Sequence, residues 1–453
     1  MSESLGQIAA TLGVAQPPQT LEVKRIVTDT RILEPGDLFL ALRGERFDGH
    51  DYLSVARERG AVAAVVDQLQ DDALVQLEVA DTRLALGLLA RARRLAWNGR
   101  LAAITGNSGK TSVKAMLASI CAQHVGMEHT LATQGNLNND IGAPLTLLGL
   151  QPQHRYAVVE LGANHLGEIA WTASLARPDV AVITNVTDAH VGEFGGSGHI
   201  AQAKGEILAG LGADGVAVLN RDDRYFPVWQ ALAGSAQVLD FSLQEAACVT
   251  VNDLAGDELG RYAFTLVLNG EHAGHVQLRL LGLHNVRNAL AAAAAAHALG
   301  IPDEAIVAGL TACDGVPGRL TLLAGINQSR LLDDSYNANP GAVKAALEAL
   351  ATLPSPRWCF LGAMGELGDD TARLHAEIGR HARELKIDFL GTLGENARPA
   401  AEAFGLQGHH FDDWASLLAY ARYHVPVNAS VLVKGSRSAG MERLVTELRA
   451  DTN

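Results

Sequence analysis

The most constraining feature of the sequence is residues 101–112, which read LAAITGNSGKTS. The apolar start is typical of a buried strand, and the residues after 112 have helical periodicity. A glycine-rich turn between a strand and a helix directs backbone N–H groups and a helix N-terminus at one point, which favours phosphate. Lys110 adds a full positive charge, and the Thr111 hydroxyl can hold Mg²⁺. The stretch predicts a phosphate-binding loop, with a glycine-rich turn and a solvated lysine as the alternative.

This loop is shorter than the usual G-x-x-x-x-G-K-[ST] pattern. Ile104 stands where that pattern has its first glycine. We therefore expect a shortened variant of the loop on an α/β scaffold.

Composition limits the kinds of partner. The formal net charge of -14 provides no basic surface for nucleic acid or an anionic membrane. The four cysteines lie far apart without a C-x-x-C pair, which favours buried thiols in a reducing compartment. The N-terminus lacks the pattern of a secretory leader, and no apolar run is long enough to span a bilayer. We expect a cytoplasmic protein that acts as a monomer on small molecules.

The length of 453 residues suggests about three domains. Residues 1–83 predict a small N-terminal α/β domain, with strands at 23–31 and 37–42. Residues 84–314 alternate strands and helices and predict a central domain with a mainly parallel sheet around the phosphate loop. Within this region, Asn269-Gly270 between two apolar stretches predicts a hairpin. Residues 315–453 again alternate strands and helices, including a strand at 387–391, and predict a Rossmann-like C-terminal domain.

Polar residues at the ends of the central strands are the next candidates, because ligands of open α/β sheets bind beyond the carboxyl ends of the strands. Glu160 ends an apolar strand and is placed to hold the nucleotide's Mg²⁺, or else caps the following helix. His190 follows the next strand. It either binds a metal or contacts a phosphate, or it has a purely structural role. Lys204 alone reads as a solvated helix lysine.

Taken together, these segments resemble the Mur ligase family over nearly the whole chain. The resemblance rests on the loop at 105–111 and on blocks at 135–142, 160–165, 185–190, 203–206, 282–288, 317–319 and 334–340. The shortened phosphate loop is a feature of that family. Within it, the chain is most similar to the members that join D-alanyl-D-alanine to UDP-N-acetylmuramoyl tripeptide, with ATP and Mg²⁺, through an acyl phosphate.

The resemblance also implies roles for individual residues. Lys110, Glu160, His190 and Lys204 would be catalytic, with Lys204 carbamylated, and Thr111, Glu160 and His190 would serve Mg²⁺. ATP would contact Thr105, Gly106, Asn107, Ser108, Gly109, Lys110, Thr111, Asn285, Arg319, Asp334 and Asn337. The UDP-sugar peptide would contact Asp29, Thr30, Arg31, Arg43, Asp48, Gly49, His50, Asn136, Asn138, Asn139 and Asp140. Lys434 and Ser436 would lie near the closed site.

Three alternatives stay open. A sister ligase that adds diaminopimelate or lysine is expected to carry a D-N-P-R loop, and residues 395–398 read ENAR, a poor match. Ligases of the folylpolyglutamate type fit the blocks at 136–140 and 334–340 less well. A nucleotide-driven switch without ligase activity is the alternative from another functional class.

Overall fold

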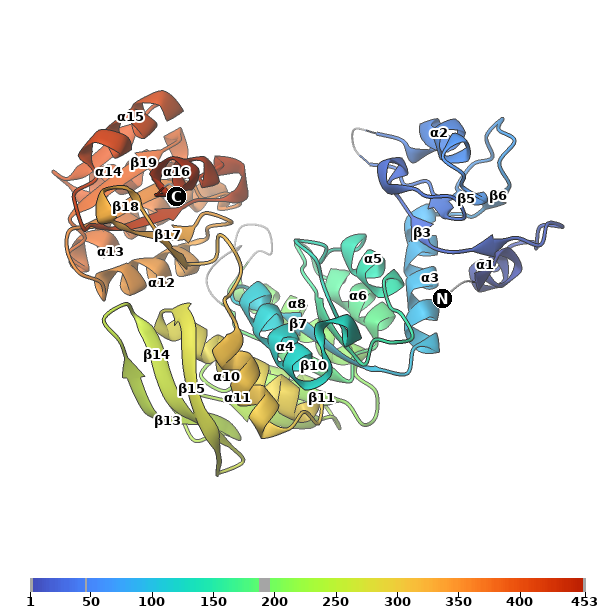
Figure 1. Ribbon diagram of the computed structural model, residues 1–453, viewed down its shortest axis with the longest axis horizontal. Helices are drawn as coiled ribbons and strands as arrows, with labels where there is room; N and C mark the ends of the chain where they lie inside the picture. The colour runs from blue at the N-terminus through green and yellow to red at the C-terminus, as the bar shows by residue number, and fades with distance from the viewer. Residues whose placement is uncertain (1–2, 45–46, 187–195, 451–453) are drawn as a thin grey trace.

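The computed structural model describes residues 3–44, 47–186 and 196–450. Over these residues the chain forms three successive bodies, blue, cyan through green to yellow, and orange to red in Figure 1. Each is built on a sheet with parallel strands, which confirms the predicted α/β class with three domains. The predicted limits at 83/84 and 314/315 stay predictions.

The N-terminal body contains a parallel sheet in the order β3-β4-β5-β6. Its strands are Ile26–Val27, Leu38–Leu40, Ala63–Val66 and Gln76–Glu78. Alternate side chains point to opposite faces of a strand, so the sheet has two apolar faces. Helix α1 (Leu5–Leu12) packs on one face and α2 (Leu53–Glu58) on the other.

The single strand predicted at 23–31 is wrong. The chain forms β2 (Glu22–Val23), which pairs with β1 (Glu3–Ser4) in a separate sheet, and then β3. The backbone turns into a 3₁₀ helix at Thr30–Ile32 because the Asp29 carboxylate accepts the backbone N–H of Arg31 at 2.9 Å. An aspartate that bonds two residues ahead competes with strand pairing.

Helix α3 (Thr82–Ala96) connects the first two bodies. The Asp81 carboxylate caps its N-terminus by accepting the backbone N–H of Leu84. Leu86 and Leu89 pack in the N-terminal core, whereas Ala90 packs in the central core. One helix therefore contributes to both cores, which ties the two bodies together.

The central sheet has nine strands in the order β15-β14-β13-β12-β11-β10-β7-β9-β8. The strands from β8 to β12 run parallel, β13 pairs in parallel with β12 at one position, and β14 and β15 continue that edge through antiparallel pairing. The parallel strands are Arg100–Thr105 (β7), Thr130–Ala132 (β8), Tyr156–Glu160 (β9), Val180–Ile183 (β10), Val216–Asn220 (β11) and Gln237–Phe241 (β12). The remaining strands are Val249–Gly256 (β13), Arg261–Leu268 (β14) and Glu271–Leu281 (β15).

Helices cover both faces of this sheet. One face carries α4 (Lys110–Val125), α10 (Leu283–Ala298) and α11 (Asp303–Ala312). The other carries α5 (Gly142–Leu148), α6 (Glu168–Ala176), α8 (Ser197–Gly205) and α9 (Phe226–Leu232). The predicted hairpin is confirmed, because Asn269 and Gly270 have φ of 49° and 86°, as a type I′ turn requires.

The C-terminal sheet has the order β16-β17-β21-β18-β19-β20, with all strands parallel except β16. Its strands are Thr321–Ala324, Arg330–Asp334, Arg357–Gly362 (β18), Phe389–Leu393 (β19), Gly408–Phe411 (β20) and Ser430–Lys434 (β21). Its helices are Pro340–Ala351 (α12), Thr371–Glu384 (α13), Arg398–Phe404 (α14), Trp414–His424 (α15) and Glu442–Leu448 (α16). The strand predicted at 387–391 begins two residues later, because the backbone N–H of Ile387 still bonds to Ala382 at the end of α13.

Candidate active site

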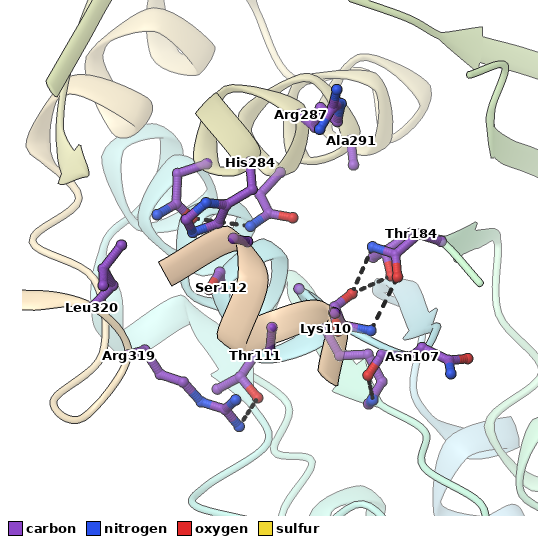
Figure 2. A pocket seen from close by; sticks show the side chains of 18 of the residues that line it. Asn107, Lys110, Thr111, Ser112, Thr184, His284, Arg287, Ala291, Arg319 and Leu320 are labelled. Atoms are coloured by element: carbon purple, nitrogen blue, oxygen red, sulfur yellow. Dashed lines mark hydrogen bonds between the residues drawn. The ribbon is translucent and has the colours of Figure 1, made fainter. Parts of the chain in front are cut away.

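A cavity of about 440 Å³ lies between the central and C-terminal bodies. The phosphate loop and the start of α10 line it from the central body, and the ends of β17 and β21 line it from the C-terminal body. Figure 2 shows Lys110, Thr111, Arg319 and His284 around this space. The predicted nucleotide residues 107–111, Asn285, Arg319, Asp334 and Asn337 all line the cavity. The structure therefore brings together residues that lie more than 200 positions apart.

The phosphate loop needs glycine at two positions. Gly106 and Gly109 have φ of +143° and +83°, which L side chains rarely adopt. A Cβ at Gly106 would lie 2.0 Å from the Thr184 Oγ1, and one at Gly109 would lie 2.4 Å from the Asn288 Oδ1. Ile104, in the place of the usual first glycine, is a fully buried residue of β7. The strand thus continues through that position, and the loop is correspondingly short.

The segment after β10 holds the phosphate loop in place. The Thr184 hydroxyl and the Asn185 side-chain amide donate to the Ser108 carbonyl at 2.6 and 3.1 Å. The Asn185 side-chain oxygen accepts the backbone N–H of Ser108, and its carbonyl accepts that of Asn107. These bonds fix the loop before any ligand arrives, as electrostatic preorganisation requires.

Lys110 begins α4 and folds back along the loop. Its ammonium donates to the carbonyls of Gly106 at 2.6 Å and Asn107 at 3.1 Å. Burial lowers the pKa of Lys110, and the nearby Arg319 lowers it further, while Glu160 opposes the shift. The ammonium is thus held inside the loop, where a phosphate group would meet it together with the backbone donors.

Arg319 crosses from the segment before β16 to the phosphate loop. Its guanidinium donates to the Thr111 Oγ1 at 3.4 Å (Figure 2). It also lies 4.3 Å from the centre of the Tyr336 ring. The distance and stacking suit a cation–π contact. Arg319 therefore connects the start of α4 to the loop after β17.

Glu160 is 2% exposed at the end of β9. The Asn138 side-chain amide donates to its Oε1 at 2.8 Å, and the Lys114 ammonium lies 3.6 Å from its Oε2. The Glu160 Oε2 is buried and makes no hydrogen bond within the described part of the chain. Sequence reasoning missed Lys114; its position four residues after Lys110, on the same side of α4, was the available signal.

The other two predicted catalytic residues are Lys204 and His190. Lys204 on α8 is 4% exposed, so the prediction that its side chain is solvated is wrong. Burial, and then the charge of Lys110, lower the pKa of Lys204 to about 7, although Glu168 and Glu206 act in the opposite direction. His190 falls in residues 187–195, outside the described residues.

The C-terminal body contributes a buried ion pair. The Lys434 ammonium, on β21, lies 2.5 Å from the Asp334 Oδ2 at the end of β17 and donates to the Asn337 carbonyl at 3.0 Å. The Asp334 Oδ1 accepts the backbone N–H of Leu320. The Ser436 hydroxyl donates to the Ala363 carbonyl and so ties together the loops after β21 and β18.

The start of α10 supplies the opposite wall. The Asn285 side-chain amide donates to the Leu281 carbonyl at 2.8 Å, and its oxygen accepts from the Asn288 amide at 2.9 Å. Burial lowers the pKa of His284 to about 4, with smaller contributions from the charges of Lys434 and Arg287. His284 is therefore neutral at physiological pH.

The predicted sugar-peptide residues of the N-terminal body lie away from this cavity. Asp29 and Arg31 form an ion pair with each other, and Thr30 lies between them. Arg43 pairs with Asp48 and Asp67. His50 is buried: its Nδ1 lies 2.6 Å from the Asp48 Oδ1, and its Nε2 accepts the backbone N–H of Asp67. At Gly49 a Cβ would lie 2.7 Å from the Leu42 carbonyl, so this loop packs closely.

The block at 136–140 lies between the N-terminal body and Glu160. Asn138 bonds Glu160, the Asn139 side chain accepts the backbone N–H of Gly142, and Asn136 accepts the backbone N–H of Asn138. Asp140 pairs with Arg83 on α3 at 3.3 Å. Arg83 also donates to the Arg43 carbonyl at 3.5 Å, so this block connects the N-terminal loop to the strand that carries Glu160.

The side chains present fit a magnesium nucleotide. Besides the Glu160 Oε2, the hydroxyls of Thr105 and Ser108 are buried without a hydrogen bond in the described structure. No cluster of three or more His, Cys, Asp or Glu side chains that could hold a metal occurs within residues 3–44, 47–186 and 196–450. Mg²⁺ is commonly bound through one or two protein oxygens and the phosphates of its nucleotide. Glu160 and Thr111 supply oxygens of that kind.

Three family models match the chain: "Mur ligase family, catalytic domain" over residues 22–94, "Mur ligase middle domain" over 104–296, and "Mur ligase, glutamate ligase domain" over 318–437. A relative from Escherichia coli strain K12, named UDP-N-acetylmuramoyl-tripeptide--D-alanyl-D-alanine ligase, is 43% identical over 99% of both chains. A relative of the same name from Haemophilus influenzae is 39% identical over 95% of this chain and 94% of its own.

Solved structures agree with these matches. MurF from Acinetobacter baumannii superposes with a TM-score of 0.91, at 38% identity over 99% of both chains. MurF from Thermotoga maritima, solved in complex with ADP, superposes with a TM-score of 0.83, at 27% identity over 94% of this chain and 97% of that one. The three matched domains and the full-length relatives lead to one conclusion: the chain belongs to the Mur ligase family.

Proposed function

We propose that the protein joins D-alanyl-D-alanine to UDP-N-acetylmuramoyl tripeptide, using ATP and releasing ADP and phosphate. The product is the UDP-muramoyl pentapeptide precursor of peptidoglycan. The observation that carries this proposal is full-length identity of 43% to a ligase named for that reaction. The preorganised phosphate loop, and the buried Glu160 on the strand beside it, are the groups that we assign to the chemistry.

The reaction needs two steps. A carboxylate oxygen of the tripeptide attacks the γ-phosphorus of ATP, which forms an acyl phosphate and releases ADP. The amine of D-alanyl-D-alanine then attacks the acyl carbon, so that an amide bond forms, phosphate leaves with the former carboxylate oxygen, and the amine loses a proton. The first step brings two anions together, so it depends on positive charge that is already in place.

Residues of the central body provide this charge. We assign Lys110 and the backbone N–H groups of residues 107–111 to the phosphates, and the oxygens of Thr111 and Glu160 to Mg²⁺. The ion, when bound, neutralises phosphate charge and so eases the approach of the carboxylate. Lys204, if carbamylated, would present a second anionic group near Lys110, whose charge acts on it.

The other predicted roles form part of the same proposal. Asn285, Arg319, Asp334 and Asn337 line the cavity and are assigned to the nucleotide. The N-terminal residues 29–31 and 43–50, with the block at 136–140, are assigned to the UDP-sugar peptide. We also propose that the protein acts as a cytoplasmic monomer. Among the described residues, no helix is both long and apolar enough to cross a bilayer.

A phosphate-release assay tests the function. Purified protein with ATP, Mg²⁺ and UDP-N-acetylmuramoyl tripeptide should release phosphate when D-alanyl-D-alanine is added, and far less with diaminopimelate, lysine or D-alanine. Release with a single amino acid as the preferred acceptor would indicate a sister ligase. Release that depends on neither substrate would indicate a nucleotide-driven switch.

A further inference from the structure

Lys114 is a buried cation beside the predicted metal ligand. It lies on α4, four residues after Lys110, and is 7% exposed. Lysine is among the residues that are least often buried, because removing an ammonium from water is unfavourable unless a partner compensates. The partner here is Glu160, whose Oε2 lies 3.6 Å from the Lys114 ammonium.

The two oxygens of Glu160 are held in different ways. Oε1 accepts a hydrogen bond of 2.8 Å from the Asn138 amide, whereas Oε2 makes no hydrogen bond within residues 3–44, 47–186 and 196–450. The 3.6 Å separation from Lys114 is an ion pair beyond hydrogen-bonding distance. Lys114 therefore attracts Oε2 through charge at a separation longer than an ordinary hydrogen bond.

The backbone of Glu160 is fixed as well. Its N–H donates to the Thr133 Oγ1 at 3.0 Å, so the residue is held from the β8 side, from the Asn138 loop and from α4. Of these three contacts, only Lys114 carries a charge. Without it, a carboxylate that is 2% exposed would have no cation within 4 Å among the described residues.

We propose that Lys114 is a positioning residue that holds the Glu160 carboxylate, through charge, in the orientation in which Oε2 receives the Mg²⁺ of the nucleotide. Lys114 acts through Glu160 and makes no contact of its own with the metal. This inference rests on the proposed function, because it requires that the cavity binds a magnesium nucleotide.

The test is the Mg²⁺ dependence of ADP binding, measured by titration calorimetry from excess EDTA to 10-fold excess Mg²⁺. Lys114→Met keeps most of the side-chain volume and removes the charge. It should raise the Mg²⁺ concentration for half-maximal ADP affinity about tenfold, with Mg²⁺-free ADP affinity changed less than about twofold. Lys114→Arg should recover most of the parent behaviour.

Two further variants separate positioning from other roles. In a Glu160→Gln background, Lys114→Met should change the Mg²⁺ requirement no further, because the group that it positions is gone. Lys344→Met is the matched control: Lys344 pairs with Glu377 on the outside of the C-terminal body, and its loss should leave the Mg²⁺ requirement unchanged. Thermal unfolding of each variant checks the fold, and Lys114→Gln replaces Lys114→Met if the latter does not fold.

The outcomes discriminate between the two proposals. An unchanged Mg²⁺ requirement in Lys114→Met overturns the positioning role. A lowered Mg²⁺ requirement also overturns it, because Lys114 would then compete with the metal. A full effect that persists in Glu160→Gln also overturns it, because Lys114 would then act on the nucleotide directly. Failure of the parent protein to bind ADP at any Mg²⁺ concentration refutes the proposed function itself.

Discussion

Lowering the pH through 7, or removing bicarbonate, should switch off the protein through Lys204. This lysine is 4% exposed on α8, and burial together with the charge of Lys110 lowers its pKa from 10.5 to about 7. Carbamylation joins CO₂ to a neutral amine and releases a proton, so it requires the unprotonated form. The pKa therefore decides whether Lys204 can carry the carbamate that the family resemblance implies.

The magnitude follows from the two pKa values. At pH 7.5 an amine with a pKa of 10.5 is about 0.1% neutral, whereas one with a pKa of about 7 is roughly three-quarters neutral. The folded protein thus raises the reactive fraction of Lys204 several hundred-fold over that of a solvated lysine. The direction of the pH dependence follows as well: as the pH falls below 7, the Lys204 ammonium forms and the carbamate is lost.

Carbon-13 NMR with labelled bicarbonate measures the modification directly. The parent protein should show a carbamate signal that grows with pH around a midpoint near 7 and is absent from Lys204→Ala. Phosphate release should fall in bicarbonate-depleted buffer and return when bicarbonate is added, and short carboxylic acids should partly restore Lys204→Ala. A carbamate midpoint near 10, or full activity of Lys204→Ala without additives, would refute this reasoning.

Three other changes test the rest of the site. Lys110→Ala should lower kcat about 10³-fold while circular dichroism stays unchanged, because a charge partner of the phosphates is lost; near-normal turnover would contradict its role. Gly109→Ala should weaken ADP binding in calorimetry at least about tenfold, whereas Gly234→Ala, also at positive φ but facing open space, should not. Lys434→Met should lower the free energy of unfolding by about 3–5 kcal/mol in urea, since Asp334 stays buried without its partner, and a second change, Asp334→Asn, should recover part of that loss.

Features that depend on local sequence were predictable. The phosphate loop combines a buried strand, two glycines and a helix start within twelve residues, and the structure has all three in that order. The Asn269-Gly270 turn was equally predictable, because few other residue pairs adopt φ above zero at both positions. Strand order also placed Glu160 at the loop, since the carboxyl ends of parallel strands share one edge.

Features that depend on distant contacts were not predictable from residue patterns. Lys204 looked like a solvated helix residue because nothing in its neighbourhood shows that α8 packs it against the core. The partnership of Lys114 with Glu160 joins α4 to β9, and that of Asn138 with Glu160 joins a loop to the same strand. The strand predicted at 23–31 failed for a local reason, the Asp29 turn, which outweighs the apolar pattern around it.

The buried cations explain how a chain of net charge -14 can hold a polyanion. Burial lowers the pKa values of Lys110, Lys114 and Lys204, and neighbouring positive charge, from Arg319 at the first two and from Lys110 at the third, lowers them further. Glu160 opposes the shifts at Lys110 and Lys114. A nucleoside triphosphate brings negative charge to Lys110, which lines the cavity, and so favours its charged form. Positive charge that is already in place at the phosphate loop can therefore attract a multiply charged anion, although the net charge of the chain is negative.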